Sequence, residues 1–323
     1  MSEHFLITGG AGFIGSHLCE ALVDQGHQVV AVDDLSTGQI ENIQHLRSLP
    51  NFQFVRETIT NLQVLDRLAS EATIVIHLAA AVGVQLIVQN PVRTIQTNVM
   101  GTEAVLTAAN RYGCKVLVAS TSEVYGKGVR IPFKEGDDSL LGPTTHSRWS
   151  YAASKAIDEF LGLAYHHQFN LPVIIMRLFN TIGPRQTGQY GMVVPRFVRQ
   201  ALRNQPLTVY GDGKQSRCFA DVRDVVEAVV KLVENSQAVG QVFNIGNTEE
   251  VTILGLAELV IELSGSQSEI VLVPYDQAYE PGFEDMYRRV PSIEKIHRLV
   301  GYVPRHPLEE TLNRIIEFEK LRL

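Results

Sequence analysis

A tyrosine and a lysine four residues apart, Tyr151 and Lys155, are the side chains with the clearest chemical use in this 323-residue sequence. The surrounding pattern predicts a helix over residues 149–169, and residues four apart lie on one helix face. An ammonium group beside a phenol favours the phenolate and lowers the tyrosine pKa toward neutrality. Such a tyrosine can take the proton of a hydroxyl group while hydride leaves the same carbon. A single Tyr-x-x-x-Lys is more commonly a core tyrosine beside a solvated lysine, so the pair needs support elsewhere in the chain.

Three glycines near the start of the chain, Gly9, Gly12 and Gly15, form a second chemical group. The apolar run before them predicts a buried parallel strand over residues 4–8, and the spacing after them predicts a helix over 14–25. Glycines at such a junction let the chain turn sharply, let the backbone approach a pyrophosphate, and let the helix pack close to the sheet. A purely structural turn uses glycine for backbone reasons as well. The pattern therefore indicates a dinucleotide site only if a matching carboxylate follows.

Asp33 is that carboxylate, because it ends a second apolar run and stands 24 positions after Gly9. This is about where dinucleotide folds place the acid that receives the adenosine ribose hydroxyls. A solvated turn is the alternative, and the neighbouring Asp34 shows that such turns attract acids. No arginine or lysine occurs between residues 29 and 38, and a carboxylate would repel a 2′-phosphate. The sequence therefore predicts NAD rather than NADP.

Short apolar runs alternate with amphipathic helical segments through about residue 177, which predicts parallel strands covered by helices on both faces. We expect an α/β fold, a doubly wound parallel sheet (Rossmann) with a smaller mixed α/β C-terminal lobe. Residues 1–180 would form the NAD-binding domain and 181–323 the substrate lobe, with part of 215–255 returning to the first domain. Strands are expected near 4–8, 28–33, 52–56, 73–78, 115–120, 172–177 and 241–245, and helices near 14–25, 91–112, 149–169, 193–203, 221–235, 252–264 and 307–319.

Composition excludes several classes of partner. The net charge of −7, without a basic cluster, argues against nucleic acid, and an anionic substrate would have to meet locally placed arginines. Cys19, Cys114 and Cys218 are far apart, so we expect neither a disulfide framework nor a metal site, and a reducing, cytoplasmic setting fits best. No apolar run approaches the roughly 18 residues of a membrane helix. A soluble protein without a membrane partner is expected.

Together, the glycine turn, Asp33, His77-Leu78-Ala79-Ala80, Asn98, Thr121 and Tyr151-x-x-x-Lys155 resemble the extended short-chain dehydrogenase/reductase family over essentially the full length. The members that the chain resembles act on nucleotide-diphosphate sugars. The resemblance implies that Tyr151 is the general base, that Lys155 orients the nicotinamide ribose and lowers the tyrosine pKa, and that Thr121 bonds the reacting hydroxyl. The implied cofactor-binding residues are Gly9, Gly12, Phe13, Ile14, Gly15, Asp33, Thr58, Ile59, Leu78, Ala79, Ala80, Asn98, Tyr151 and Lys155.

The C-terminal half carries segments that resemble those holding the sugar nucleotide. Asn180 matches a residue that contacts the phosphates, and residues 206–211 match the segment that holds the base. A guanidinium binds pyrophosphate oxygens bidentately, and Arg217 and Arg289 are candidates for that clamp, whereas Arg288 is expected to form a surface salt bridge. The implied substrate-binding residues are Asn180, Arg185, Val194, Thr208, Tyr210, Arg217 and Arg289.

The segment Thr121-Ser122-Glu123 resembles UDP-glucuronate decarboxylases, as do residues 213–219 and 246–253. Oxidation at C4 makes the sugar a β-keto acid, whose carboxylate leaves easily because the ketone accepts the electrons. A nearby acid or base such as Glu123 then handles the proton at C5. The resemblance thus implies decarboxylation of UDP-glucuronate to UDP-xylose or a UDP-4-keto-pentose, with Tyr151, Lys155, Thr121, Glu123 and Ser122 as catalytic residues.

Other reactions remain open on the same scaffold. Residues 81–87 are small and apolar where many decarboxylases carry a proline-rich, aromatic segment, and they equally suit a 4-epimerase of UDP-glucose or UDP-glucuronate. Ser122 replaces the aspartate usual in NDP-glucose 4,6-dehydratases, which counts against dehydration. Thr58 stands where an aspartate often meets the adenine, although threonine still offers a hydrogen bond. The family's usual homodimer would use helices 91–112 and 149–169, unless their apolar faces pack within one subunit.

Overall fold

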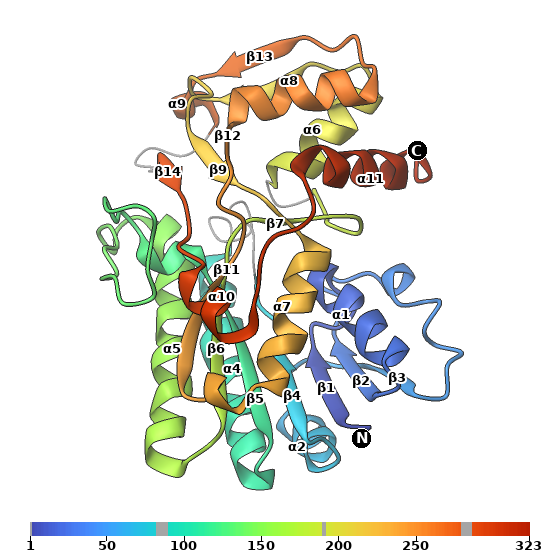
Figure 1. The fold of residues 1–323 in the computed structure, drawn as a ribbon, viewed down its shortest axis with the longest axis vertical. Helices are drawn as coiled ribbons and strands as arrows, with labels where there is room; N and C mark the ends of the chain where they lie inside the picture. The colour runs from blue at the N-terminus through green and yellow to red at the C-terminus, as the bar shows by residue number, and fades with distance from the viewer. Residues whose placement is uncertain (1, 82–89, 189–191, 279–285) are drawn as a thin grey trace.

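The computed structural model describes residues 2–81, 90–188, 192–278 and 286–323, and its largest element is a seven-stranded sheet (Figure 1). The strand order is β11-β6-β5-β4-β1-β2-β3, and every neighbouring pair is parallel. The predicted doubly wound α/β sheet is confirmed. The order reverses between β1 and β4, where such sheets bind ligands at the carboxyl ends of the strands. The strands are β1 (His4–Thr8), β2 (Gln28–Asp33), β3 (Phe52–Arg56), β4 (Ile74–His77), β5 (Lys115–Thr121), β6 (Val173–Leu178) and β11 (Gln241–Ile245).

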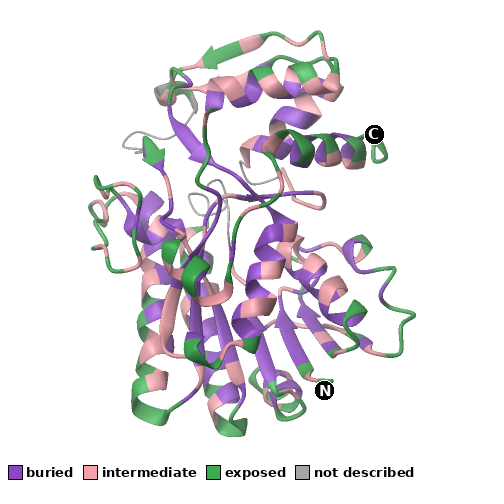
Figure 2. Cartoon of the chain, viewed as in Figure 1, coloured by how far each residue is buried: buried purple, intermediate pink, exposed green. Residues whose placement is uncertain are grey.

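Helices cover both faces of this sheet because its strands are apolar on both sides. In β1, Phe5 and Ile7 pack with α1, α7 and α10, whereas Leu6 packs with α2, α4 and α5. Figure 2 shows the strands buried between these two layers. The helix expected at 91–112 has those bounds in the structure, whereas α2 and α10 were not predicted from the sequence. The helices are α1 (Phe13–Asp24), α2 (Leu62–Ser70), α4 (Pro91–Tyr112), α5 (Ser150–Phe169), α7 (Val222–Glu234) and α10 (Glu294–Val300).

The C-terminal lobe is a smaller mixed structure with its own core, which includes Phe197, Leu256 and Leu312. It contains a three-stranded sheet, β12-β9-β14, and the pairs β13-β8 and β10-β7 within the described residues. The chain also returns from this lobe, because β11 pairs with β6 at the edge of the large sheet. Its elements are β7 (Thr181–Ile182), α6 (Val193–Leu202), β8 (Leu207–Tyr210), β9 (Ser216–Cys218), β10 (Ala220–Asp221), β12 (Glu250–Thr252), α8 (Ile253–Ser264), β13 (Ile270–Val273), α9 (Tyr275–Ala278), β14 (Arg288–Arg289) and α11 (Leu308–Lys320).

Short 3₁₀ turns occur at η1 (Ile40–Asn42), η2 (Ser122–Tyr125), η3 (Ser147–Trp149) and η4 (Ser236–Ala238). Of the helices in the described ranges, none combines the length and the apolar character needed to cross a membrane.

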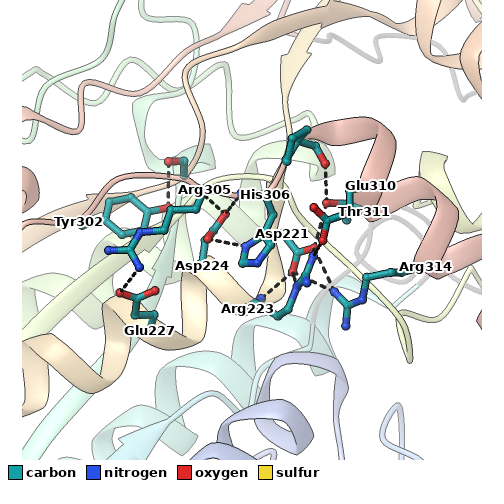
Figure 3. Close-up of polar contacts among 12 residues, drawn as sticks. Asp221, Arg223, Asp224, Glu227, Tyr302, Arg305, His306, Glu310, Thr311 and Arg314 are labelled. Atoms are coloured by element: carbon teal, nitrogen blue, oxygen red, sulfur yellow. Dashed lines mark hydrogen bonds and ion pairs between the residues drawn. The ribbon is translucent and has the colours of Figure 1, made fainter.

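The carboxylate of Asp221 ties the C-terminal lobe to α7. It accepts a hydrogen bond from the Arg223 backbone N–H at 2.8 Å and one from the Thr311 hydroxyl of α11 at 2.9 Å. The guanidinium groups of Arg223 and Arg314 lie 2.8 and 3.1 Å from it (Figure 3). Burial alone would raise the pKa of Asp221, but these donors lower that pKa to about 2.

Asp224, three residues further along α7, holds the chain segment between α10 and α11. Its Oδ2 accepts the backbone N–H groups of Arg305 and His306 at 3.1 and 3.2 Å, and its Oδ1 lies 2.7 Å from His306 Nδ1 (Figure 3). The buried carboxylates of Asp221, which caps α7, and of Asp224 within α7 therefore fix the C-terminal segment to this helix.

Replacing Asp221 by asparagine should lower the free energy of unfolding at pH 7 by about 2 kcal/mol, because a depressed carboxyl pKa stabilises the fold by about 1.4 kcal/mol per unit. The folded-state pKa lies below the unfolded-state value. This stability is therefore complete above about pH 4 and is lost as the pH falls toward about 2. Urea unfolding between pH 7 and pH 3 measures both effects, with the exposed Asp138→Asn as control. Parallel stability curves for wild type and Asp221→Asn would contradict the assignment.

Candidate active site

A cavity of about 630 Å³ lies between the two lobes, at the carboxyl ends of β1, β2, β4, β5 and β6. Most of the residues predicted for the site line it. Asn98 and Thr208 are the two that do not. The predicted residues on its wall are Gly9, Gly12, Phe13, Ile14, Gly15, Asp33, Thr58, Ile59, Leu78, Ala79, Ala80, Thr121, Ser122, Glu123, Tyr151, Lys155, Asn180, Arg185, Val194, Tyr210, Arg217 and Arg289.

The three glycines of the first turn are required by close backbone approach. Gly9 has φ +72°, and a Cβ on it would lie 2.9 Å from the Ala79 nitrogen. A Cβ on Gly15 would lie 2.2 Å from the Gly9 carbonyl oxygen, so only glycine lets α1 start this close to β1. Gly12 precedes the first residue of α1, at the cavity wall. The turn thus presents a helix N-terminus to the cavity, the arrangement that binds a pyrophosphate.

Asp33 ends β2 with its carboxylate at the cavity wall. Its Oδ2 accepts the Ala11 N–H at 3.1 Å and its Oδ1 accepts the Leu35 N–H at 2.8 Å. Burial raises the pKa of this carboxyl, while those backbone donors oppose the rise. The neighbouring Asp34 accepts a bond from Ser36 N–H on the exposed side of the turn. The geometry leaves Asp33 as an oriented acceptor for ribose hydroxyls.

Asn98 supports the site from behind the cavity wall. It is fully buried in α4, accepts the Ala81 N–H at 2.8 Å and donates to the Ser154 hydroxyl at 3.0 Å. It therefore links the chain after β4 to α5. Of residues 81–87, only Ala81 belongs to the described part of the chain.

Tyr151, Lys155 and Thr121 meet at the centre of the cavity wall, where α5 passes the end of β5. Tyr151 and Lys155 are both buried, and a hydrogen bond from Thr121 acts on the Tyr151 phenol. The Lys155 Nζ lies 2.7 Å from the Asp158 Oδ2, one turn along the same helix. The ammonium is therefore already paired with a carboxylate.

This pairing changes the expected chemistry of Tyr151. The sequence predicts that Lys155 lowers the phenol pKa, but in this structure the pKa of Tyr151 is raised. Burial is the main cause, and the carboxylates of Glu123 and Asp158 add to it because both disfavour a phenolate. In the protein alone, the pKa of Tyr151 is therefore raised rather than lowered.

Glu123 also lines the cavity, and it lies between two buried arginines. It forms ion pairs with Arg148 and with Arg289, whose Nη1 is 3.1 Å from its Oε1. The Arg289 Nη1 also lies 3.3 Å from the Ser122 hydroxyl. Burial would raise the pKa of Glu123, but Arg289, Arg148 and then Arg217 lower it to about 2. Arg148 and Arg289, which pair directly with Glu123, and Arg217 therefore keep this carboxylate charged at the cavity wall.

Arg185, predicted to bind the substrate, has a partner on the first domain. Its Nη1 and Nη2 lie 2.7 and 2.8 Å from the two carboxylate oxygens of Glu20 on α1. Its φ of +71° is in the left-handed region that favours glycine. The pair holds the loop after β7 against α1, although Arg185 still borders the cavity.

The end of the cavity in the C-terminal lobe is built around Tyr210. The guanidinium of Arg196 lies 4.3 Å from the centre of its ring and donates to the Thr208 carbonyl at 3.0 Å. Gln215 donates to the Tyr210 carbonyl at 2.9 Å, and Val194 closes the wall from α6. Thr208 therefore contacts Arg196 and does not itself line the cavity. Nearer the centre, Asn180 donates to the Cys218 carbonyl at 3.0 Å.

Sequence reasoning missed several lining residues, chiefly Arg148, Arg196, Gln215 and Tyr275. For Arg148 a signal was available, because it stands three residues before Tyr151 at the approach to the predicted helix. Arg196 on α6, Gln215 before β9 and Tyr275 on α9 come from separate parts of the C-terminal lobe, and only the folded chain brings them to one cavity wall.

Residues 5–246 match the model of the NAD dependent epimerase/dehydratase family. The chain is 42% identical over 319 residues to the UDP-N-acetyl-alpha-D-glucosaminuronate decarboxylase of Bacillus cytotoxicus, with 98% of each covered. It is 40% identical to UDP-glucuronic acid decarboxylase 1 of Arabidopsis thaliana, over 96% of this chain and 68% of that protein. The UDP-glucuronic acid 4-epimerase of Bacillus cereus, solved with UDP-glucuronic acid and NAD, matches with a TM-score of 0.90 and 31% identity, over 99% of this chain and 100% of that one.

These likenesses agree with the geometry of the cavity. A glycine turn that a Cβ would block, a helix N-terminus and an oriented Asp33 carboxylate fit a dinucleotide. The predicted family and cofactor are confirmed: the chain is an NAD-dependent enzyme of the epimerase/dehydratase family, within the extended short-chain dehydrogenases/reductases.

Proposed function

We propose that this enzyme oxidises a UDP-hexuronate at C4 and then releases its carboxylate as CO₂, with UDP-glucuronate as substrate. The observation that carries the proposal is the cluster of Arg148, Arg217 and Arg289 around Glu123, next to Tyr151. In a protein of net charge −7, guanidinium groups gathered at one wall of the cavity favour a substrate carboxylate. Relatives 37–42% identical to the chain, named as UDP-sugar acid decarboxylases, support the same reaction.

The cofactor site follows from the first domain. The Gly9–Gly15 turn and the start of α1 would hold the pyrophosphate, and Asp33 would accept the adenosine ribose hydroxyls. Thr58 and Ile59 would border the adenine, while Leu78 to Ala80 form the wall after β4. Bound there, NAD supplies the acceptor for a hydride from C4.

Oxidation at C4 needs a base at the sugar hydroxyl. The Tyr151 phenolic oxygen takes the 4-hydroxyl proton as the C4–H bond breaks and C4=O forms. Thr121 holds the same sugar oxygen by a hydrogen bond. Lys155, at the wall one turn from Tyr151, orients the nicotinamide ribose.

Decarboxylation then follows from the charges around Glu123. The C5–C6 bond breaks, CO₂ leaves, and the electron pair moves toward the C4 oxygen before C5 takes a proton. Arg148 and Arg289 would orient the departing carboxylate, and the Ser122 hydroxyl lies beside them. Glu123 offsets part of their charge, so the carboxylate is oriented without being held so tightly that it cannot leave. With a pKa of about 2, Glu123 is an unprotonated carboxylate at neutral pH and holds no proton to give, so the proton that C5 takes comes from solvent and not from Glu123 as the sequence suggested.

The C-terminal lobe would hold the UDP portion. Asn180 and Arg217 face the region expected for the phosphates, and Tyr210 with Arg196 provides a flat surface for the uracil. Arg185 serves this site indirectly by fixing its loop to Glu20.

We also propose a homodimer formed by α4 and α5. These helices pack on each other and yet leave large apolar side chains exposed, with Val92 at 67% and Phe160 at 74% relative exposure. Met100 and Ile157 are exposed on the same two helices, which is expected of an uncovered subunit interface. The free thiols of Cys19, Cys114 and Cys218 support a reducing, cytoplasmic location.

Incubation with UDP-glucuronate should release CO₂ and give a UDP-pentose, or its 4-keto form lighter by two hydrogens, as measured by mass spectrometry. Tyr151→Phe should lose activity by about 10²- to 10⁴-fold, since it lacks the phenolic base. UDP-N-acetylglucosaminuronate is assayed in parallel. An unchanged product mass with a new stereoisomer would instead make the enzyme a 4-epimerase, and equal turnover by Tyr151→Phe would remove the assigned base.

Replacing Asp33 by asparagine should weaken NAD binding by about tenfold or more, because an oriented charged acceptor is lost. It should also narrow the preference for NAD over NADP, since the variant no longer repels a 2′-phosphate. Calorimetry with both cofactors measures this, and Asp34→Asn is the matched control. Wild-type affinity in Asp33→Asn would show that this carboxylate does not meet the ribose.

Introducing a charge at the exposed Phe160, as Phe160→Glu, should convert the dimer to a monomer without altering the fold. Burying an unpaired carboxylate in an apolar interface costs several kcal/mol. Light scattering of both proteins at equal concentration decides this. A wild-type monomer, or a dimeric variant, would place the interface elsewhere or remove it.

A further inference from the structure

Lys155 at the cavity wall forms an ion pair with Asp158, which the sequence did not lead us to expect. The two side chains are 3% and 0% exposed and 2.7 Å apart. The second carboxylate oxygen, Asp158 Oδ1, has no hydrogen-bond partner among the described residues. A half-satisfied buried carboxylate costs free energy, so stability alone does not account for an aspartate here.

A line of polar side chains connects the glycine-turn strand to the same carboxylate. The Thr8 hydroxyl accepts the Ala79 N–H at 3.2 Å and lies 2.7 Å from His77 Nδ1. The His77 Nε2 lies 3.0 Å from the Thr102 hydroxyl. Burial raises the pKa of Asp158, while Lys155 and a hydrogen bond from Thr102 oppose that rise. Burial lowers the pKa of His77 to about 3, so the ring is neutral. One nitrogen of the neutral ring carries the proton and donates, and the other accepts, so His77 links the hydroxyls of Thr8 and Thr102 in either tautomer.

Asp158 therefore determines how much of the Lys155 charge acts on Tyr151. An ammonium paired at 2.7 Å has its field largely offset, and Asp158 itself is among the charges that disfavour the Tyr151 phenolate. The titratable and charged groups that face this cluster are His77 from β4, Glu123 from η2, Arg148 from η3, and Tyr151, Lys155, Asp158 and Glu159 from α5.

We propose that Asp158 is a positioning residue for the Tyr151–Lys155 pair: it anchors the Lys155 ammonium, offsets its charge, and thereby sets the pH at which Tyr151 acts as a base. Lys155 and the Thr102 hydroxyl, at the end of the Thr8–His77–Thr102 line, oppose the rise in the Asp158 pKa that burial causes. The inference rests on the proposed role of Tyr151 as the base.

Asp158→Asn tests this because it removes the charge and keeps the shape. We expect the titration midpoint of Tyr151 to fall by about one pH unit or more, since the phenolate loses an adjacent anion and gains the uncompensated ammonium. The measurement is ¹³C NMR of the NAD-bound enzyme labelled at tyrosine Cζ, with the Tyr151 signal assigned from Tyr151→Phe. The acidic limb of the pH profile for reduced nicotinamide formation should move the same way. Asp158→Glu should keep the wild-type midpoint.

Glu159→Gln is the matched control. Glu159 is a buried carboxylate on the same turn of α5, but its partner is Arg177, so this variant should lose stability and leave the Tyr151 midpoint unchanged. If Asp158→Asn does not fold, Asp158→Leu replaces it, because an apolar side chain avoids an unsatisfied amide. A Tyr151 midpoint that stays at or rises above the wild-type value in a folded variant, or an equal shift in Glu159→Gln, would overturn the proposal. The NMR titration needs no sugar nucleotide, so its outcome is independent of whether decarboxylation is observed.

Discussion

The burial of charged side chains on α5 is the constraint on which the active site depends. Lys155, Asp158 and Glu159 lie within two turns of this helix and are almost fully buried against the large sheet. Each needs a partner, since an unpaired charge in the core would cost several kcal/mol. Asp158 meets Lys155, while Arg177 on β6 contacts both oxygens of Glu159 at 3.0 and 2.8 Å and Ser120 on β5 contacts Oε1 as well. These contacts fix the height and rotation of α5 over the carboxyl ends of β5 and β6.

The same need for charge compensation joins the two lobes. Asp221 and Asp224 draw the C-terminal segment onto α7, and Glu20 holds Arg185 and its loop against α1. Ion pairs with at least one partly exposed partner therefore link the two lobes. At the cavity wall, Arg148 and Arg289 form ion pairs with Glu123.

Backbone patterns were predictable from the sequence, whereas the partners of charged side chains were not. The helix at 91–112 follows from apolar periodicity, which reports burial directly. The pKa of Tyr151 is raised rather than lowered, because the phenol is buried and the carboxylates of Glu123 and Asp158 lie nearby, and Asp158 also pairs with Lys155. Arg185 was expected to bind the substrate and pairs with a glutamate of α1. A charged side chain often has several oppositely charged groups within reach. Its rotamer and its neighbours distant in sequence determine which of them it pairs with, and neither leaves a periodic signal in the sequence.

The fate of a 4-keto sugar in this fold depends on the groups beside C5 rather than on the oxidation itself. Epimerisation needs only that the keto sugar turn over and be reduced, so its main requirement is room. Loss of CO₂ needs a carboxylate held with its C5–C6 bond aligned to the carbonyl, yet bound weakly enough to leave as a neutral molecule. In the proposed reaction Arg148 and Arg289 would orient the carboxylate, and Glu123, which pairs with both, would lower the field that an incoming anion meets. A 4-epimerase of UDP-glucuronate must also accommodate a carboxylate, so the arginines by themselves favour a hexuronate substrate, and the balance between holding and releasing its carboxylate rests with Glu123.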